Sequence, residues 1–176
     1  MRGVRLFAVM MVAAVVSGCA GYNWRSEVPA AMRTVAVPTM RNESRVTELG
    51  SVTTRQLLRE FQREGTFAIA PVGETALEIQ GVIKDSGHGE LGYDRRSGMR
   101  VRIGELRVIA EVSVIDKAAG KVLVDNRRYE AVTVQNLGQD INTANRDASG
   151  RLAEDLARQI VDDVLNLKWE TGKAEK

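Results

Sequence analysis

Apolar side chains recur at every second position through the middle of the chain, residues 77–134, and segments of helical period flank this stretch on both sides. Alternation of period two predicts β-strands with one buried face. The predicted strands are 77–84, 101–114 and 121–134. A segment rich in Gly, Asp and Arg at 85–98 is expected to form the top of a long hairpin, and short turns connect only antiparallel strands. Beside Gly104 the apolar phase slips by one residue, which predicts a β-bulge.

The flanking segments predict two amphipathic helices. The first helix is expected to follow the N-capping residues Asn42 and Ser44 and to stop at Gly65. The second is expected to begin at Asp140, and its apolar stripe, with steps of three or four residues, runs to Val164. Each stripe needs an apolar surface to pack against, and the meander of strands supplies one.

Two short strands precede the meander. One is predicted at 33–37, where Pro38 ends it. The other, at 67–69, is expected to merge into the meander, so the sheet has four strands in all. The expected fold is α+β, with two helices packed on one face of a four-stranded, mixed and mainly antiparallel sheet. Trp169 is expected to be the last residue of the core.

The N-terminus has the features of a secretory signal peptide. Arg2 and Arg5 precede an apolar run from Leu6 to Val16. A helix that spans a membrane needs about 20 apolar residues, so this run is too short to be one. The segment is therefore expected to be removed from the mature protein.

The end of this signal resembles the lipobox of bacterial lipoproteins. Ser17 and Gly18 lead directly to Cys19, the single cysteine of the chain. The resemblance implies cleavage before Cys19, a diacylglycerol thioether on its thiol, and acylation of the new amino group. Ala20 follows rather than Asp, which in such lipoproteins indicates the outer membrane. The alternative is an ordinary signal peptide followed by a chance cysteine.

Four segments are expected along the chain. They are a lipoprotein signal peptide at 1–18, the lipidated cysteine and a tether at 19–31, a single α+β domain at 32–169, and a polar tail at 170–176. Removal of the signal peptide takes away two arginines and no acid, which leaves 23 basic and 23 acidic side chains. Proteins that bind nucleic acid carry a basic excess, so that class of partner is excluded.

The chain offers few residues for catalysis. His88 is the single histidine and is predicted to lie in a solvated loop, so neither a catalytic triad nor a multi-histidine metal site can form around it. Gly87, Gly89 and Gly92 have the G-x-G-x-x-G spacing, but a strand rather than a helix follows them. We expect a protein that is not an enzyme and holds no metal or cofactor, apart from the covalent lipid on Cys19.

A cluster of arginines marks the predicted hairpin tip. Its members are Arg95, Arg96, Arg100 and Arg102. Arginine forks bind phosphate in bidentate fashion, so the cluster predicts an anion site for the head of a phosphorylated glycolipid. The alternative is that these charges only protect exposed strands from aggregation.

The chain as a whole resembles the lipopolysaccharide-assembly lipoprotein (LptE) family. The resemblance lies in 19–22, 35–42, 57–61, Phe67, 77–83, Tyr93, 114–117, 120–123 and the final helix. It implies a plug-like subunit in the lumen of LptD, a large β-barrel of the outer membrane. It further implies that the subunit assists assembly of that barrel and binds lipopolysaccharide for insertion into the outer leaflet.

Size and tether length bear on this expectation. A domain of about 140 residues has a radius of gyration near 15 Å, and only barrels of about 22 strands or more hold a plug. The alternative function is an outer-membrane lipoprotein that activates a periplasmic cell-wall synthase or serves an efflux or transport complex. A tether of about 12 residues reaches at most ~40 Å, which favours a partner in the same membrane.

Overall fold

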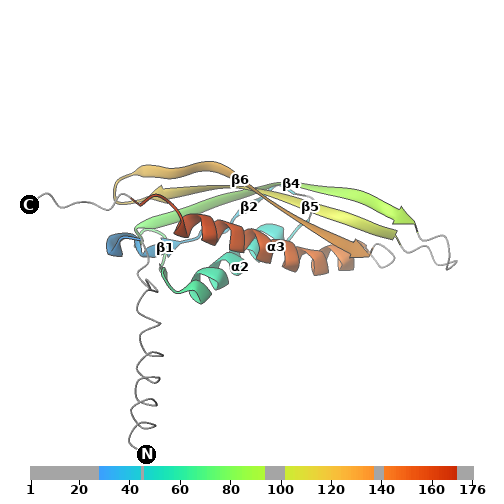
Figure 1. The fold of residues 1–176 in the computed structure, drawn as a ribbon, viewed down its shortest axis with the longest axis horizontal. Coiled ribbons are helices and arrows are strands. Elements are labelled where there is room, and N and C mark those ends of the chain that lie inside the picture. Colours follow the sequence, from blue (N-terminus) through green and yellow to red (C-terminus); the bar gives the residue numbers. More distant parts are fainter. Residues whose placement is uncertain (1–27, 45, 94–101, 137–140, 170–176) are drawn as a thin grey trace, which may run out of the picture.

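The computed structural model describes residues 28–44, 46–93, 102–136 and 141–169. One sheet and two long helices form two layers, with both helices on the same face of the sheet (Figure 1). The elements are η2 (Ala30–Met32), β1 (Thr34–Ala36), β2 (Arg41–Asn42), α2 (Leu49–Glu64), β3 (Ala68–Ile69), β4 (Leu77–Tyr93), β5 (Arg102–Asp116), β6 (Lys121–Asn136) and α3 (Ile141–Leu165). The predicted α+β class is confirmed.

The sheet has six strands rather than the predicted four, in the order β3-β1-β4-β5-β6, and β2 also pairs with β4. The pairs β4–β5 and β5–β6 are antiparallel, whereas β1–β3, β1–β4 and β2–β4 are parallel. Proline has no N–H to donate to a ladder, and Pro38 lies between β1 and β2. The ladder therefore stops after Ala36 opposite Glu78 and resumes at Arg41 opposite Val82.

Strand β4 is longer than the sequence predicts. Residues 85–93, expected to be a loop, pair with β5 from Asp85 opposite Ile109 to Tyr93 opposite Arg102. His88 accordingly lies in a strand and not in a loop. The composition was misleading because the hydrogen bonds of a ladder are made by the backbone, which glycine supplies as well as any residue.

An irregularity lies at the level of Gly104, as the phase slip predicts, but in the opposite strand. Glu90 pairs with Gly104 and Gly92 with Ile103, so the additional residue is Leu91 of β4. The prediction of a bulge in the strand that contains Gly104 was wrong in this respect. A slip of phase in one strand does not tell which partner carries the additional residue.

Helix α2 begins later than predicted. Its N-cap is Glu48, without a side-chain hydrogen bond. The Asn42 amide Nδ2 instead donates to the carbonyls of Val46 (2.7 Å) and Thr47 (3.0 Å), while its Oδ1 accepts from the N–H of Ser44 (3.0 Å). Asn42 and Ser44 thus hold the turn before the helix. The predicted stop at Gly65 is confirmed, since this residue has a φ of 83° and closes α2 in the left-handed conformation.

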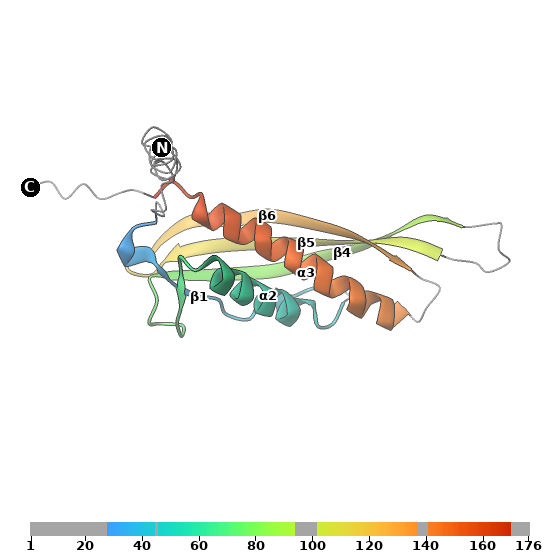
Figure 2. The same cartoon turned by 60° about the horizontal axis from the view of Figure 1, so that its bottom comes forward.

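The core lies between the sheet and the two helices, which cross it side by side (Figure 2). The largest fully buried side chains come from both layers: Leu49, Leu57 and Phe61 of α2, Leu152, Leu156 and Ile160 of α3, and Leu77, Ile79, Ile83 and Leu106 of the sheet. Phe61 meets Phe67 edge to face, with ring centroids 5.4 Å apart. Trp169 packs against this core, as predicted.

Candidate functional site

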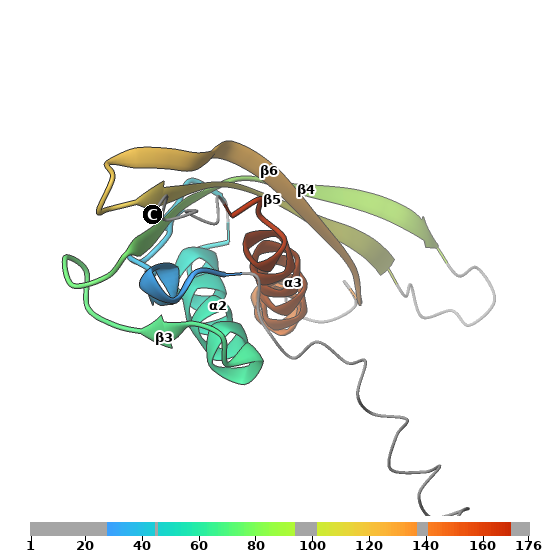
Figure 3. The ribbon, with the colours of Figure 1, turned by 60° about the vertical axis from the view of Figure 1, so that its left-hand side comes forward.

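The two ends of the sheet are formed by different parts of the β4–β5 pair. At one end, Leu77 of β4 pairs with Asp116 of β5, and the chain enters the fold at Val28. At the other end, Tyr93 pairs with Arg102. The 15 residues of β5 in extended form separate these ends by about 45 Å. The view along the helices shows the long β4–β5 hairpin reaching away from the rest of the fold (Figure 3).

The residues predicted to carry function lie mostly outside the described part of the chain. These are Cys19, Arg95, Arg96 and Arg100. Arg102 is the first residue of β5, opposite Tyr93 at the end of the hairpin. The lipid site and the arginine cluster therefore stay predictions. In the sequence, Arg95, Arg96 and Arg100 lie between the end of β4 and the start of β5.

The face of the sheet that the helices leave open is covered by paired charges. Lys84 lies 2.6 Å from Glu111, and Arg107 bridges Glu105 (2.9 Å) and Glu130 (2.8 Å). Each of these cations has an acidic partner from its own strand or a neighbouring one. The charges of this face therefore largely neutralise one another.

Two exposed valines interrupt the charges on this face. Val132 and Val134 of β6 are 45% and 55% exposed. Val132 lies opposite Arg107 in the ladder, and Val134 lies opposite Glu105. The open face thus combines a ladder of ion pairs with a small apolar patch near its outer edge.

Glu78 is the buried carboxylate of this open face. Its Oε1 accepts a hydrogen bond from Gln80 Nε2 at 2.6 Å, and Lys117 Nζ lies 3.1 Å from its Oε2. The hydrogen bond from Gln80 and the neighbouring Lys117 ammonium lower the pKa of Glu78, against the opposing effect of burial.

This arrangement predicts a contribution to acid stability. Because the pKa of Glu78 is lower in the fold than in the unfolded chain, about 4.3, its carboxylate stabilises the fold above the unfolded value. That contribution is lost as the pH falls through the lower, folded value. We expect Glu78→Gln to cost about 1 kcal/mol at pH 7 and to flatten the decline of unfolding free energy below pH 4.3. Urea titrations between pH 7 and pH 3 measure both effects. Glu74→Gln, on an exposed turn, is the control, and equal slopes for the two variants would contradict the prediction.

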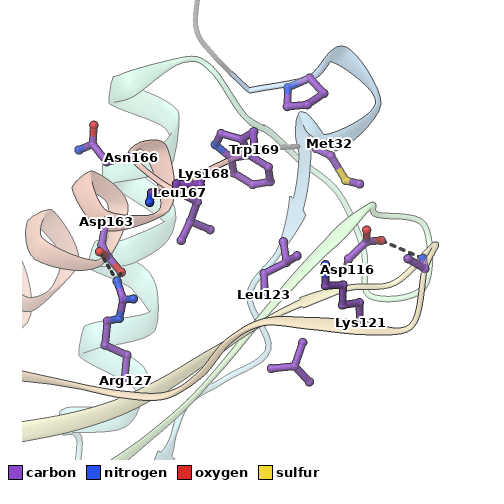
Figure 4. A pocket seen from close by; sticks show the side chains of 13 residues that line it. Met32, Asp116, Lys121, Leu123, Arg127, Asp163, Asn166, Leu167, Lys168 and Trp169 are labelled. Carbon is purple, nitrogen blue, oxygen red and sulfur yellow. Dashed lines mark hydrogen bonds and ion pairs between the residues drawn. The ribbon is translucent and has the colours of Figure 1, made fainter. Parts of the chain in front are cut away.

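A cavity of about 580 Å³ lies at the end where the chain enters the fold (Figure 4). Its walls come from η2, the β5–β6 turn, the first half of β6, the last turn of α3 and the residues that follow that helix. The lining residues are Pro29, Met32, Asp116, Ala119, Lys121, Val122, Leu123, Arg127, Asp163, Asn166, Leu167, Lys168 and Trp169. The cavity is therefore assembled from three separate parts of the sequence.

Both acids of this cavity are engaged by neighbouring groups. Oδ1 and Oδ2 of Asp163 each accept a hydrogen bond from Arg127 Nη1 at 2.5 Å, and Oδ2 also accepts one from the Tyr129 hydroxyl at 2.6 Å. Burial, followed by the hydrogen bond to Asp163, raises the pKa of Tyr129. Asp116 Oδ1 accepts the backbone N–H groups of Ala118 (2.9 Å) and Ala119 (3.0 Å). These contacts join β6 to α3 and shape the turn into β6.

The cavity lining combines apolar side chains with charged ones. In the described residues, no three His, Cys, Asp or Glu side chains gather where they could hold a metal ion. This cavity was not predicted from the sequence. Lys121 and Trp169 are far apart in sequence, and no motif connects them. No helix in the described ranges is long and apolar enough to cross a bilayer.

Comparison with solved structures shows that this fold occurs elsewhere. A hypothetical protein from Chlamydia trachomatis matches with a TM-score of 0.53 and 13% identity, over 78% of this chain and 98% of its own. A protein from Helicobacter pylori, assigned as a homolog of neuraminyllactose-binding hemagglutinin, matches with a TM-score of 0.52 and 10% identity, over 81% and 89%. A minor lipoprotein from Acinetobacter baumannii matches with a TM-score of 0.46 and 14% identity, over 78% and 93%. At these identities the likeness concerns the fold alone.

Comparison of the sequence with family models identifies the family of this chain. No curated protein sequence matches this chain. The model of the family described as "LptE: Lipopolysaccharide-assembly" matches residues 32–164, which include both long helices but for the last residue of α3, and every strand. The resemblance read from the sequence is thereby confirmed, and the chain belongs to the lipopolysaccharide-assembly (LptE) family.

Proposed function

We propose that this protein is an outer-membrane lipoprotein of the lipopolysaccharide export machinery. In this role it plugs the LptD β-barrel, assists assembly of that barrel, and binds lipopolysaccharide on its way to the outer leaflet. The role is non-enzymatic. The observation that carries the proposal is the family match over residues 32–164.

The shape of the molecule is consistent with a plug. The fold is elongated, because β5 alone extends about 45 Å. Its open face presents ion pairs such as Lys84–Glu111, which suit a water-filled lumen better than an apolar interface. The tether would attach one end to the inner leaflet through Cys19, and the hairpin end would reach furthest from that attachment.

The partner is tested by affinity purification of the tagged protein from detergent-solubilised outer membranes. We expect a large β-barrel protein to be recovered in near-equal amount, together with lipopolysaccharide. Mass spectrometry of the mature chain is expected to find Cys19 as the first residue, carrying lipid. Recovery of a cell-wall synthase or an efflux complex in place of the barrel would instead support the alternative function.

The arginine cluster is tested by charge reversal of Arg95, Arg96, Arg100 and Arg102 to glutamate. We expect the variant to bind lipopolysaccharide at least about tenfold more weakly, since each lost bidentate contact to phosphate contributes to affinity, while its thermal unfolding is unchanged. The control reverses the exposed residues Arg55, Arg59, Arg128 and Arg146, which gives the same net charge. Equal binding by the two variants would show that the cluster serves solubility only.

A further inference from the structure

Strand β6 forms one edge of the sheet, because the strand order ends with it. It is 16 residues long, whereas β3 at the opposite edge has two residues. An edge strand of this length presents backbone N–H and C=O groups with which a strand of another molecule can pair. The contacts on the outer side of β6 therefore bear on whether the protein associates through this edge.

Three residues of β6 direct their backbone groups away from β5. In an antiparallel pair, successive residues alternately direct both groups towards the partner strand and away from it. The carbonyls of Glu130 and Val134 accept hydrogen bonds from side chains of α3, so these two residues face outward. Val132 lies midway between them in the ladder and therefore faces the same way.

Arg151 and Gln159 of α3 supply these hydrogen bonds. Gln159 Nε2 donates to the carbonyl of Glu130 at 3.0 Å, and Arg151 Nη2 donates to the carbonyl of Val134 at 3.3 Å. Arg151 Nε also donates to the hydroxyl of Thr133 at 3.2 Å. The two donors are eight residues apart, so they lie on one face of α3, the helix that packs against β6 (Figure 2).

Asp163 continues this row of side chains by one helical turn beyond Gln159. Its carboxylate accepts hydrogen bonds from Arg127 and from the hydroxyl of Tyr129, both in β6. The row thus holds the strand at three levels. Two of the three contacts occupy outward carbonyl groups, which a paired strand would otherwise use.

With these carbonyls free, the outer edge would suit a second copy of the same strand. Antiparallel pairing about Val132 places Val132 of one copy opposite Val132 of the other, and Glu130 opposite Val134. Neither pair opposes like charges, and Glu130 already has its own partner in Arg107, 2.8 Å away. Val132 and Val134 are 45% and 55% exposed, so the valines of two copies would form one continuous apolar strip across the open faces.

We propose that Arg151 and Gln159 block the edge of the sheet. By occupying the outward carbonyls of Glu130 and Val134, they prevent β6 from pairing with β6 of a second copy and keep the protein monomeric. The inference concerns self-association and does not depend on the proposed function.

Removal of both donors tests the proposal. Alanine is the best helix former, so Arg151→Ala with Gln159→Ala is expected to retain α3. Sedimentation equilibrium of the full chain in density-matched detergent is expected to show a monomeric wild type. We expect self-association of the double variant to be at least about tenfold stronger, because main-chain hydrogen bonds provide affinity in strand addition. Gln62→Ala with Arg146→Ala changes the same residue types at positions exposed on α2 and α3, and it is expected to behave as the wild type.

Two additions to the double variant identify the surface. Val132→Pro removes an N–H that faces away from β5, so it spares the ladder between β5 and β6 but is expected to restore the monomer. Val132→Cys is expected to give a disulfide-linked dimer on oxidation. Opposed residues that exchange both hydrogen bonds have Cα atoms about 5.5 Å apart, a separation that a disulfide spans.

Two outcomes would overturn the inference. A double variant that folds and stays as monomeric as the wild type would show that the edge needs no blocking by these side chains. Self-association that persists with Val132→Pro would show that the copies do not pair through β6. If thermal unfolding shows that the double variant has lost its fold, Gln159→Ala alone decides by the same measurements, since it frees one carbonyl and leaves the contacts of Arg151 in place.

Discussion

Gly50→Ala is expected to lower the free energy of unfolding by about 3 kcal/mol, although alanine is the better helix former. A Cβ at Gly50 would lie 2.5 Å from the carbonyl oxygen of Met40 and 3.1 Å from Cβ of Asn42. The segment that bears these atoms cannot yield easily, because Asn42 pairs with Ile83 in the sheet. The glycine that slightly weakens the helical pattern is thus what lets α2 approach β2.

Gly150→Ala is the matched control. Gly150 lies within α3, and a Cβ there would meet nothing within 4 Å. This variant is expected to be more stable than the wild type by about 0.5–1 kcal/mol. Urea unfolding followed by circular dichroism compares the two variants under the same conditions. A Gly50→Ala protein as stable as the wild type would refute the close contact between α2 and β2.

Thr54→Val is expected to lower the free energy of unfolding by about 2 kcal/mol. The Thr54 hydroxyl accepts the N–H of Met40 at 2.9 Å and donates to the carbonyl of Gly50 at 2.8 Å. Valine has nearly the same shape but offers no acceptor. The N–H of Met40, in a residue only 3% exposed, would then be buried without a partner.

Thr53→Val is the neighbouring control, with the opposite expected sign. Thr53 is fully buried, and in the described part of the chain its Oγ1 has no hydrogen-bond partner. Valine removes the cost of burying that hydroxyl, so the variant is expected to be more stable by about 1 kcal/mol. Chemical denaturation of both variants measures the difference. Changes of the same sign at the two positions would contradict the hydrogen bonding described for Thr54.

The helices and most of the strands could be predicted because burial of one face leaves a local period in the sequence. The stripe that ends at Val164 and the stop at Gly65 are properties of a few neighbouring residues, and both were found in place. The family could also be predicted, since its short segments keep their order along the chain.

The elements that were missed depend on partners far away in the chain. Residues 85–93 have the composition of a loop and become a strand because β5 lies beside them. Strand β2 has two residues and no pattern of its own, and it exists through its pairing with β4. Propensity is a weak guide at such positions, where the backbone pairing decides the structure.

The candidate sites likewise differ in whether a local sequence pattern indicates them. Cys19 is indicated by the residues directly before it, because a signal sequence is recognised as a linear segment. The cavity brings Met32, Lys121 and Trp169 together, and no local pattern indicates that these residues meet. For this protein the linear sequence determined the periodic elements, the predicted export signal and the family. Tertiary contacts alone decided that residues 85–93 form a strand, that α2 needs a glycine at position 50, and that a cavity opens beside Trp169. Each of these features depends on residues that meet only after folding.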